Sequence, residues 1–417
     1  MNYNERKFNM DVAAVAGLRE AVIADYIRGL QLTSDETAYR HGYFWVKCTQ
    51  KTMTVHILFL TEDMVRHSVK KLVEKGIIKV AALDDDVCIE TDEGITGYGT
   101  SYELNFVDRL GQLLIGENPL NNEKLWKRMY VPKFLGRKGN SLWSISAIDI
   151  ALWDIRSKVS GIPLYQLLGG SRESVPYYIA GGYYAPGKGI RELQQEMEEY
   201  LSWGAKAVKM KVGVLSLEED AARVKAVREV IGDKVKLMMD ANCAYKAYEA
   251  VEFSKMVEEY HPYWFEEPVD ADDYDGYRKI SEKTIIPIAA GENEMTRYGF
   301  RDLFKTHAVD ILNPDAACCG GITEYMKIAS MADANGIVMS PHGQQQVHVH
   351  LDCAIPNVIM AEFYPPQYDA KIYEAFQNPV RLNPDGTVSP SDVPGVGLDI
   401  NRDVLKDYMV EDSSYAL

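Results

Sequence analysis

From residue 174 onward, short apolar runs alternate along the chain with longer stretches of helical periodicity. The apolar runs are VPYYIA, AVKMKVG, VKLMMDAN, YWFEEPV, IPIAAGENE, VDILNPD, GIVMSPHG and NVIMAEFY. Strands that alternate with amphipathic helices are typical of parallel sheets, and eight such units predict a (β/α)8-type barrel over residues 174–365. In such a barrel the functional side chains lie at the carboxyl ends of the strands.

Two lysines interrupt the second of these runs, at VKMKVG. Side chains two positions apart in a strand point to the same face, so Lys209 and Lys211 share one environment and the valines and methionine between them occupy the other. Either that face is exposed to water, or two ammonium groups lie close together for a chemical reason.

Polar side chains also end the other runs. They are Asp240 and Asn242 on the third run, Glu266 and Glu267 on the fourth, Glu292 on the fifth, Asp315 on the sixth, His342 on the seventh and Glu362 on the eighth. Three carboxylates on consecutive strands repel one another unless a cation neutralises them, because burying unpaired charge is costly. We therefore expect Asp240, Glu266 and Glu292 to bind Mg²⁺, which prefers oxygen ligands, with structural ion pairs as the alternative.

The first 83 residues have a different pattern. Residues 11–30 carry apolar residues at helical spacing, and residues 44–46 and 53–55 are expected to be short strand or turn elements. Thr61 can cap a second helix, Gly76 ends it, and the strand-like run IIKVAAL follows. This order resembles the winged-helix modules of bacterial and phage replication-initiation or regulatory proteins, over residues 8–82.

Charge bears on what this amino-terminal module could bind. Residues 1–80 contain 12 Lys and Arg against 9 Asp and Glu, whereas the whole chain has a formal charge of -16. The body therefore repels nucleic acid and the module need not. Residues of its second helix would face DNA: Arg66, His67, Lys70 and Lys71. They are equally consistent with a solvated helix face, and a winged helix can also serve as a protein contact.

Composition narrows the class of protein. The 417 residues are 47% hydrophobic and 25% charged, which is ordinary for a soluble globular protein of two or three domains. No secretory start and no apolar run of about 18 residues is present, so a cytoplasmic protein without a membrane span is expected. The six cysteines have no CxxC spacing, which favours reduced, packed thiols.

Between the module and the barrel, residues 84–173 suggest an α+β cap domain. CIETDEGITGYGT alternates like a strand, turns at residues 92–94 and resumes, and helical segments follow with a break at residues 161–163. Residues 366–417 are expected to complete the barrel and the cap.

Taken together, KMK, MMDAN, WFEEP, GEN, the NPD and SPHG pair and the late MAEF resemble the enolase superfamily, in its mandelate racemase-like branch. The resemblance spans residues 84–417. It implies that Lys211 is the base and Lys209 the companion that lowers its pKa, and that Asp315 and His342 form a dyad. It also implies the three Mg²⁺ ligands named above, and a Glu362 that hydrogen-bonds the enolate of the substrate.

In this family, two acid/base centres on opposite faces serve either β-elimination of water or racemisation. We expect dehydration of a sugar acid to a 2-keto-3-deoxy acid, with a racemase or epimerase of a 2-hydroxy acid as the alternative. A third reading, from another class, is a DNA-bound sugar-acid sensor with an inactive barrel. Family members are often oligomers, so a homo-oligomer is expected.

Substrate contacts are expected from Asn242, Tyr183 and Gln344, the last within the polar run GQQQVHVH. One departure from the family concerns the lid. The family begins with a strand and a mobile specificity loop, where this chain has the winged-helix-like module. The remaining lid candidates are residues 126–140 and the pair Tyr183 and Tyr184.

Overall fold

The computed structural model describes residues 37–40, 43–46, 86–102, 104–367, 373–401 and 404. The chain divides into two compact units, one of residues 1–86 with 402–417 and the other of residues 87–401. In the first unit, β1 (Thr37–Arg40) and β2 (Tyr43–Val46) pair antiparallel, so residues 44–46, expected to form a strand or a turn, lie in a strand. The rest of the predicted winged-helix module lies outside the described residues, including Arg66, His67, Lys70 and Lys71.

Residues 86–170 form a two-stranded sheet and a set of helices. The elements are β3 (Asp86–Glu90), β4 (Thr96–Thr100), α5 (Val107–Gly111), α6 (Asn122–Met129), α7 (Pro132–Leu135), α8 (Asn140–Ser160) and α9 (Leu164–Leu167). Strand β4 approaches the backbone of α8 closely because Gly97 and Gly99 have no Cβ. A Cβ on Gly99 would lie 1.9 Å from the carbonyl oxygen of Ala147. The break predicted after α8 is present, since Gly161 ends the helix in the left-handed conformation.

All eight predicted barrel strands are present. They are β5 (Val175–Gly181), β6 (Ala207–Lys211), β7 (Lys236–Asp240), β8 (Trp264–Glu266), β9 (Ile288–Ala290), β10 (Ile311–Leu312), β11 (Val338–Met339) and β12 (Ala361–Phe363). Strands β5 to β11 pair in sequence order, all parallel, and β12 pairs with β5. The strand order and direction are those of a (β/α)8 barrel.

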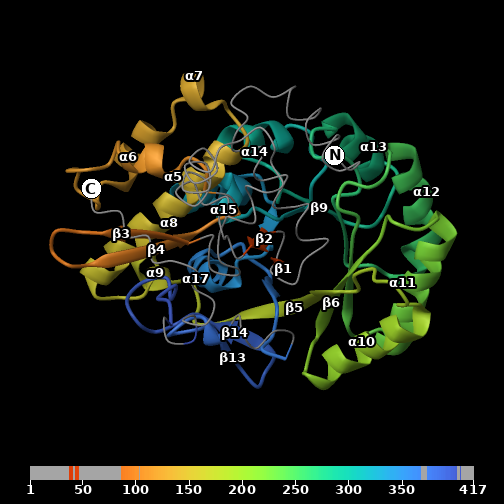
Figure 1. Ribbon diagram of the computed structural model, residues 1–417. Helices are drawn as coiled ribbons and strands as arrows, with labels where there is room; N and C mark the ends of the chain where they lie inside the picture. Colours follow the sequence, from red (N-terminus) through yellow and green to blue (C-terminus); the bar gives the residue numbers. More distant parts are fainter. Residues whose placement is uncertain are drawn as a thin grey trace, which may run out of the picture. The chain divides into compact units, whose positions relative to one another are not determined.

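The helices between these strands are α10 (Ile190–Ser202), α11 (Leu217–Ile231), α12 (Ala247–Val257), the 3₁₀ turn η1 (Glu258–Tyr260), α13 (Tyr274–Ser281), α14 (Thr296–Phe304), α15 (Ala316–Cys319), α16 (Gly321–Ala334) and α17 (Gln345–Ala354). Figure 1 shows α10 to α13 along the outer side of the strands. Each begins soon after a strand ends, which is the repeating unit that the alternating sequence pattern predicts.

The barrel is not fully paired, because strands β11 and β12 share no continuous ladder. Between β11 and β12 the ladder is replaced by one isolated bridge, Met339 to Val358, with backbone hydrogen bonds of 2.9 and 2.8 Å at Met339. The expectation of a closed barrel is therefore wrong at this seam. The physical reason lies in Pro341, which has no N–H to continue the ladder. The hydroxyl of Ser340 spans the seam instead, donating to the carbonyl of Met360 at 2.9 Å.

The carboxyl-terminal residues attach to both the barrel and the long helix α8. Strand β13 (Arg381–Leu382) pairs with β14 (Thr387–Ser389), and β14 pairs antiparallel with β5. Beyond them, Asp399 forms an ion pair of 2.8 Å with Lys158 of α8. These contacts agree with a carboxyl-terminal part that completes the fold, while the boundaries 84–173, 174–365 and 366–417 stay predictions.

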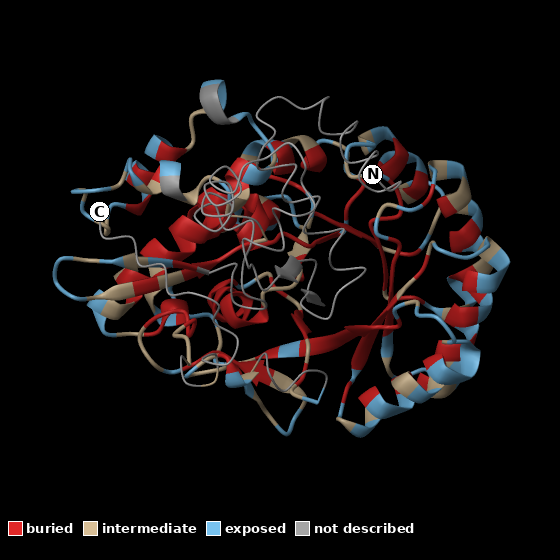
Figure 2. Cartoon of the chain, in the orientation of Figure 1, coloured by how far each residue is buried: buried red, intermediate tan, exposed pale blue. Residues whose placement is uncertain are grey.

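The two faces of the barrel strands are buried in different ways. The outward face packs against the helices, as with Val208 and Met210, and forms the main apolar core. The inward face holds a smaller apolar cluster that includes Tyr178, Met238 and Trp264. Figure 2 shows buried strands inside helices whose outer sides are exposed. Among the described residues, no helix has the length and apolar character needed to cross a membrane.

Candidate active site

The register of the parallel strands brings the predicted site residues to one level. Lys211 on β6 pairs with Asp240 on β7, and Asp240 pairs with Glu266 on β8. Because side chains at paired positions of parallel strands point to the same face, these three groups lie side by side. Lys209 lies one inward position below Lys211 and is 1% exposed, so the face that the two lysines share is the barrel interior and not solvent.

The three predicted metal ligands do converge. One carboxylate oxygen from each of Asp240, Glu266 and Glu292 lies within 4.8 Å of the others. Glu292 reaches this position because Gly291 adopts a φ of +137°, where a side chain would be strained. One oxygen of Glu292, Oε2, is buried and has no hydrogen-bond partner among the described residues. A buried carboxylate oxygen that accepts no hydrogen bond, beside two further buried carboxylates, fits a hard divalent cation.

Lys209 is at the centre of the buried carboxylates. Its ammonium lies 2.8 Å from Glu266, 3.0 Å from Glu362 and 3.4 Å from Asp240. Burial alone would lower the pKa of Lys209, but these carboxylates raise it well above its usual value. In return, Lys209 holds the pKa of Asp240 below its usual value despite burial. Lys209 is therefore charged and neutralises part of the site.

Lys211 differs from the expectation in one respect. Burial and the neighbouring Lys209 both lower its pKa, as the sequence suggested, but its ammonium donates to Asp240 at 2.5 Å. The contact with Asp240 outweighs the other two effects, and the pKa of Lys211 is raised. The sequence could not show this contact, because it depends on the register of β6 and β7.

Asp315 and His342, which end β10 and β11, form the predicted pair. His342 Nδ1 lies 3.0 Å from Asp315 Oδ2, and His342 Nε2 lies 3.6 Å from Glu292. Burial raises the pKa of Asp315, but hydrogen bonds and nearby imidazoles lower it below its usual value, so the carboxylate accepts and Nδ1–H donates. Burial lowers the pKa of His342, yet Glu292 and Asp315 raise it to about 10.

Glu362, which the family resemblance implies to hydrogen-bond the enolate of the substrate, accepts hydrogen bonds in this structure. It accepts from the backbone N–H of Gly343 at 2.6 Å and pairs with Lys209. Burial raises its pKa, but Lys209 and His342 lower it below its usual value. Glu362 is therefore an anion in this arrangement.

The three expected substrate contacts lie around this group in different ways. Tyr183 is 36% exposed, its ring lies 5.4 Å from the Lys211 ammonium, and its hydroxyl is 3.1 Å from that of Tyr364. Asn242 has an exposed side chain, and its backbone N–H donates to Asp240 at 2.9 Å. Gln344 is half-buried at the start of α17, with a φ of +42°.

The neighbours of Gln344 in the polar run have structural roles instead. The side-chain amide of Gln345 bonds the backbone of Tyr364, and that of Gln346 bonds the carbonyls of Asn378 and Gly397. Both side chains are buried. Contacts within the protein therefore occupy the side-chain amides of Gln345 and Gln346, and Gln344 stays the predicted substrate contact of this run.

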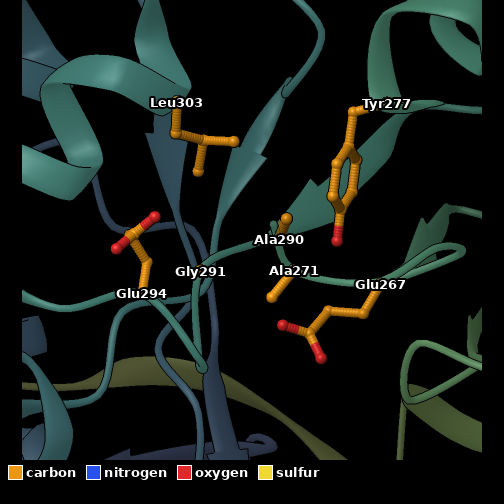
Figure 3. A pocket seen from close by; sticks show the side chains of 7 residues that line it. All are labelled: Glu267, Ala271, Tyr277, Ala290, Gly291, Glu294 and Leu303. Atoms are coloured by element: carbon orange, nitrogen blue, oxygen red, sulfur yellow. The ribbon is translucent and has the colours of Figure 1, made fainter. Parts of the chain in front are cut away.

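Glu267 contacts an amide and a thiol. It accepts from Asn293 at 2.8 Å and from the Cys243 thiol at 3.3 Å, and burial and Glu292 raise its pKa to about 8. Figure 3 shows its carboxyl group at a small cavity beside the site, with Tyr277 and Glu294 among the lining residues. These partners make Glu267 a support for the loop that carries Glu292.

Sequence reasoning missed two residues that contact Asp315. The hydroxyl of Tyr102, which follows β4, donates to Asp315 Oδ2 at 2.6 Å. His348 lies 3.7 Å from Asp315 and donates from Nδ1 to the carbonyl of Gly343 at 2.7 Å. His348 could have been found from its place six residues after His342, whereas nothing in the local sequence marks Tyr102.

Of the two lid candidates, residues 126–140 contact the loop after β9. Lys138 pairs with Glu294 at 2.8 Å, and the backbone N–H of Gly139 donates to the sulfur of Met295 at 2.9 Å. Tyr184, in the other candidate, donates to Asp220 at 2.5 Å. Both segments are therefore anchored to the barrel loops, and a lid role stays a prediction.

Comparison with known proteins assigns the fold and this site to a family. Residues 192–404 match the enolase C-terminal domain-like family, and residues 86–169 match the mandelate racemase/muconate lactonizing enzyme N-terminal domain. The chain therefore belongs to the enolase superfamily, in its mandelate racemase/muconate lactonizing enzyme branch. The winged-helix resemblance of residues 8–82 stays a prediction.

Similar proteins include enzymes that act on sugar acids. Arabinonate dehydratase of Saccharolobus solfataricus is 36% identical over 334 residues, which are 77% of this chain and 89% of that protein. D-galactarolactone cycloisomerase of Agrobacterium fabrum is 35% identical over 344 residues, 78% of this chain and 90% of that protein. The crystal structure of L-talarate dehydratase from Polaromonas sp. JS666, complexed with Mg and L-glucarate, has 34% identity and a TM-score of 0.72, covering 78% of this chain and 92% of that one.

Proposed function

We propose that this chain is a Mg²⁺-dependent hydro-lyase that removes water from a sugar acid to form a 2-keto-3-deoxy acid. One observation carries the proposal: a lysine and an aspartate-held histidine flank a single carboxylate triad. Lys211 contacts Asp240 of the triad, and His342 lies 3.6 Å from Glu292. Relatives named as dehydratases of arabinonate, galactarate, xylonate and rhamnonate support the substrate class.

In the first step, Lys211 removes the proton α to the substrate carboxylate. It acts in its neutral form, which a cation held by Asp240 would favour, because Asp240 is the main group that raises the pKa of Lys211. The C–H bond breaks, the proton goes to Nζ, and the electron pair delocalises into the carboxylate as an enolate. When held by Asp240, Glu266 and Glu292, Mg²⁺ supplies a Lewis acid that stabilises this negative charge. Lys209, buried and charged, keeps a second positive charge nearby.

In the second step, His342 donates the proton on Nε2 to the hydroxyl at the β-carbon. The C–O bond breaks, water leaves, and the electron pair of the enolate forms the new C=C bond. The resulting enol then tautomerises to the 2-keto acid. Asp315 accepts from Nδ1–H throughout, which fixes the ring so that Nε2 is the atom free to transfer the proton.

Substrate hydroxyls are proposed to contact Tyr183, Asn242 and Gln344. Tyr183 supports this role best, because its ring lies beside the Lys211 ammonium and its side chain is partly exposed. Racemisation would use the same two acid/base groups and return a proton to the opposite face of the α-carbon. The test therefore has to separate loss of water from simple exchange of the α-proton.

The test is a screen of sugar acids with the purified full chain and Mg²⁺, scored for 2-keto acid and for deuterium uptake at the α-carbon in D₂O. We expect keto acid from at least one acid, and a loss of about 10²-fold or more in Lys211→Ala, the range for removal of a general base. Lys225→Ala is the control, because Lys225 is exposed on α11. Deuterium uptake without keto acid would favour racemisation. If no acid gives either keto acid or deuterium uptake, the proposal that this chain is an enzyme of this type is refuted.

A further inference from the structure

The carboxylate that orients His342 is held by three donors, and one of them comes from the cap. Asp315 is fully buried. Its Oδ1 accepts from the backbone N–H of Ala317 at 2.7 Å, while its Oδ2 accepts both from Tyr102 at 2.6 Å and from His342 at 3.0 Å. The hydrogen bonds from Ala317 and Tyr102 together fix the plane of the Asp315 carboxylate. The orientation of that plane then determines where the His342 imidazole can donate its Nδ1–H.

Tyr102 itself is held rigidly at this point. It is 213 positions from Asp315 in sequence, but the preceding residue, Ser101, donates its hydroxyl to the carbonyl of Ala317 at 2.7 Å. The ring of Tyr102 packs edge-on against Trp143 of α8, with centroids 6.1 Å apart. Two consecutive residues after β4 thus bond the turn that carries Asp315.

The backbone beside His342 leaves room for the phenol. Gly343 has a φ of +57°, and a Cβ at this position would lie 3.2 Å from the Tyr102 oxygen. A larger residue at position 343 would press on the hydroxyl, so the glycine serves both the turn and the approach of Tyr102.

We propose that Tyr102 is a positioning residue of the dehydration step, which orients the Asp315 and His342 pair from the cap. The inference rests on the proposed function, and it assigns the cap a part in proton delivery. The phenol does not act on Lys211, whose contact is Asp240. Its loss therefore affects proton donation to the leaving hydroxyl and leaves removal of the α-proton intact.

The consequence is a change in how the enolate partitions. With His342 less well oriented, the enolate loses water more slowly and more often takes its proton back. The substrate recovered from D₂O then contains more deuterium for each molecule of keto acid formed. A merely structural loss would lower exchange and elimination together.

The experiment compares Tyr102→Phe, which keeps the ring, with Ser101→Ala, which removes the neighbouring bond from the cap. The substrate is the fastest acid among arabinonate, galactarate, xylonate and rhamnonate. For Tyr102→Phe we expect kcat for keto acid to fall by about ten- to a hundredfold, the effect of a lost hydrogen bond to a charged group, with KM changed less than about twofold. The exchange-to-elimination ratio should rise by about fivefold or more in Tyr102→Phe and stay at the wild-type value in Ser101→Ala.

A second measurement does not depend on activity. In protein labelled with ¹⁵N-histidine, the Nδ1–H proton of His342 is assigned by its loss in His342→Asn, and its chemical shift reports the bond to Asp315. We expect the shift to move in Tyr102→Phe and not in Ser101→Ala. An unchanged shift, a parallel fall of exchange and elimination, or the same ratio in both variants would overturn the positioning role. If the wild type shows no turnover but the Nδ1–H chemical shift of His342 still moves in Tyr102→Phe, the proposed function is refuted, while the orientation of His342 and Asp315 by Tyr102 remains supported.

Discussion

At the scale of single residues, the buried carboxylates of the site differ in how many hydrogen bonds they accept. Asp315 accepts three hydrogen bonds, and Glu362 accepts one from a backbone N–H and pairs with the Lys209 ammonium. By contrast, Glu292 Oε2 is buried and accepts no hydrogen bond from the described residues. A buried carboxylate oxygen without a donor is costly unless a cation approaches it. His342 Nε2 lies 3.6 Å from this oxygen, which is too far for a hydrogen bond, so a bound metal ion would supply the close positive partner that Glu292 Oε2 lacks.

Replacing Glu292 should weaken the metal site without removing its other two carboxylates. For Glu292→Gln we expect Mg²⁺ affinity, measured by isothermal titration calorimetry, to fall by about tenfold or more. Residues that only hydrogen-bond a metal ligand already contribute about ten- to a hundredfold in affinity, and a direct ligand should contribute no less. Asp272→Asn is the matched control, since Asp272 is 85% exposed. Equal affinities in Glu292→Gln and the wild type would exclude Glu292 as a ligand.

His350 on α17 should make the protein sensitive to acid. Neither ring nitrogen has a hydrogen-bond partner among the described residues, and burial lowers the pKa of His350 to about 3. An unfolded histidine has a pKa of about 6.5, so below that pH the unfolded chain gains a proton that the folded chain does not, and stability falls.

The size of this effect can be measured from unfolding by urea between pH 7 and pH 5. We expect the wild type to lose about 2 kcal/mol more than His350→Gln over this range, because one group contributes at most about 1.4 kcal/mol per pH unit. His261→Gln, at an exposed position, should keep the wild-type slope. A wild-type slope in His350→Gln would contradict the assignment.

At the scale of elements, the cap is held to the barrel by contacts of α6 and α8 with the chain from the end of α15 into α16. The indole of Trp126 donates to the carbonyl of Gly320 at 2.7 Å, and Asp149 of α8 accepts from the backbone and hydroxyl of Thr323 at 2.8 and 2.7 Å. These bonds fix the stretch that begins with Asp315. The close packing of β4 on α8 through glycines therefore bears on the site, since Ser101 and Tyr102 directly follow β4.

A methyl group at Gly99 should disrupt this packing. In Gly99→Ala the new Cβ would lie 1.9 Å from the Ala147 carbonyl, so β4 and α8 must separate. We expect a loss of about 3 kcal/mol or more in urea unfolding, the upper range for overpacked cores. Gly111→Ala, which meets no atom within 4 Å, should change stability by less than about 1 kcal/mol. Similar midpoints for the two variants would contradict the close approach.

At the scale of the whole molecule, the barrel interior holds an excess of buried negative charge. Asp240, Glu266 and Glu362 surround the buried ammonium of Lys209, and Asp240 also contacts the ammonium of Lys211. Burial raises the pKa of Glu266 to about 8, and the neighbouring carboxylates add to the rise. Because a bound cation relieves this repulsion only in the folded state, metal binding stabilises the fold itself.

Mg²⁺ should therefore raise the melting temperature of the full chain. At a concentration 100 times the dissociation constant, binding contributes about 2.7 kcal/mol, which corresponds to a rise of several degrees. EDTA should reverse the rise in differential scanning calorimetry, and Asp240→Asn should reduce it strongly. A rise of the same size in Asp240→Asn would place the stabilising ion elsewhere.

Much of the fold followed from local pattern. The eight strands, the break after α8 and the ligand triad could be predicted, because strand periodicity fixes which side chains share a face and barrel topology brings strand ends together. The Asp315 and His342 pair was expected only from the resemblance to the enolase superfamily. The open seam at Met339 and Val358 was not foreseen. It depends on how Pro341 and Ser340 meet a strand from the far end of the repeat, which no local pattern contains.

The chemistry of the site divides in the same way. The types of group at the strand ends, and hence the superfamily and its Mg²⁺, are properties of the amino-acid order. Which lysine contacts which carboxylate is set by register and burial, and these raise the pKa of Lys211 where sequence reasoning expected a fall. The bond from Tyr102 to Asp315 joins residues 213 positions apart, so only the packing of the cap on the barrel could create it.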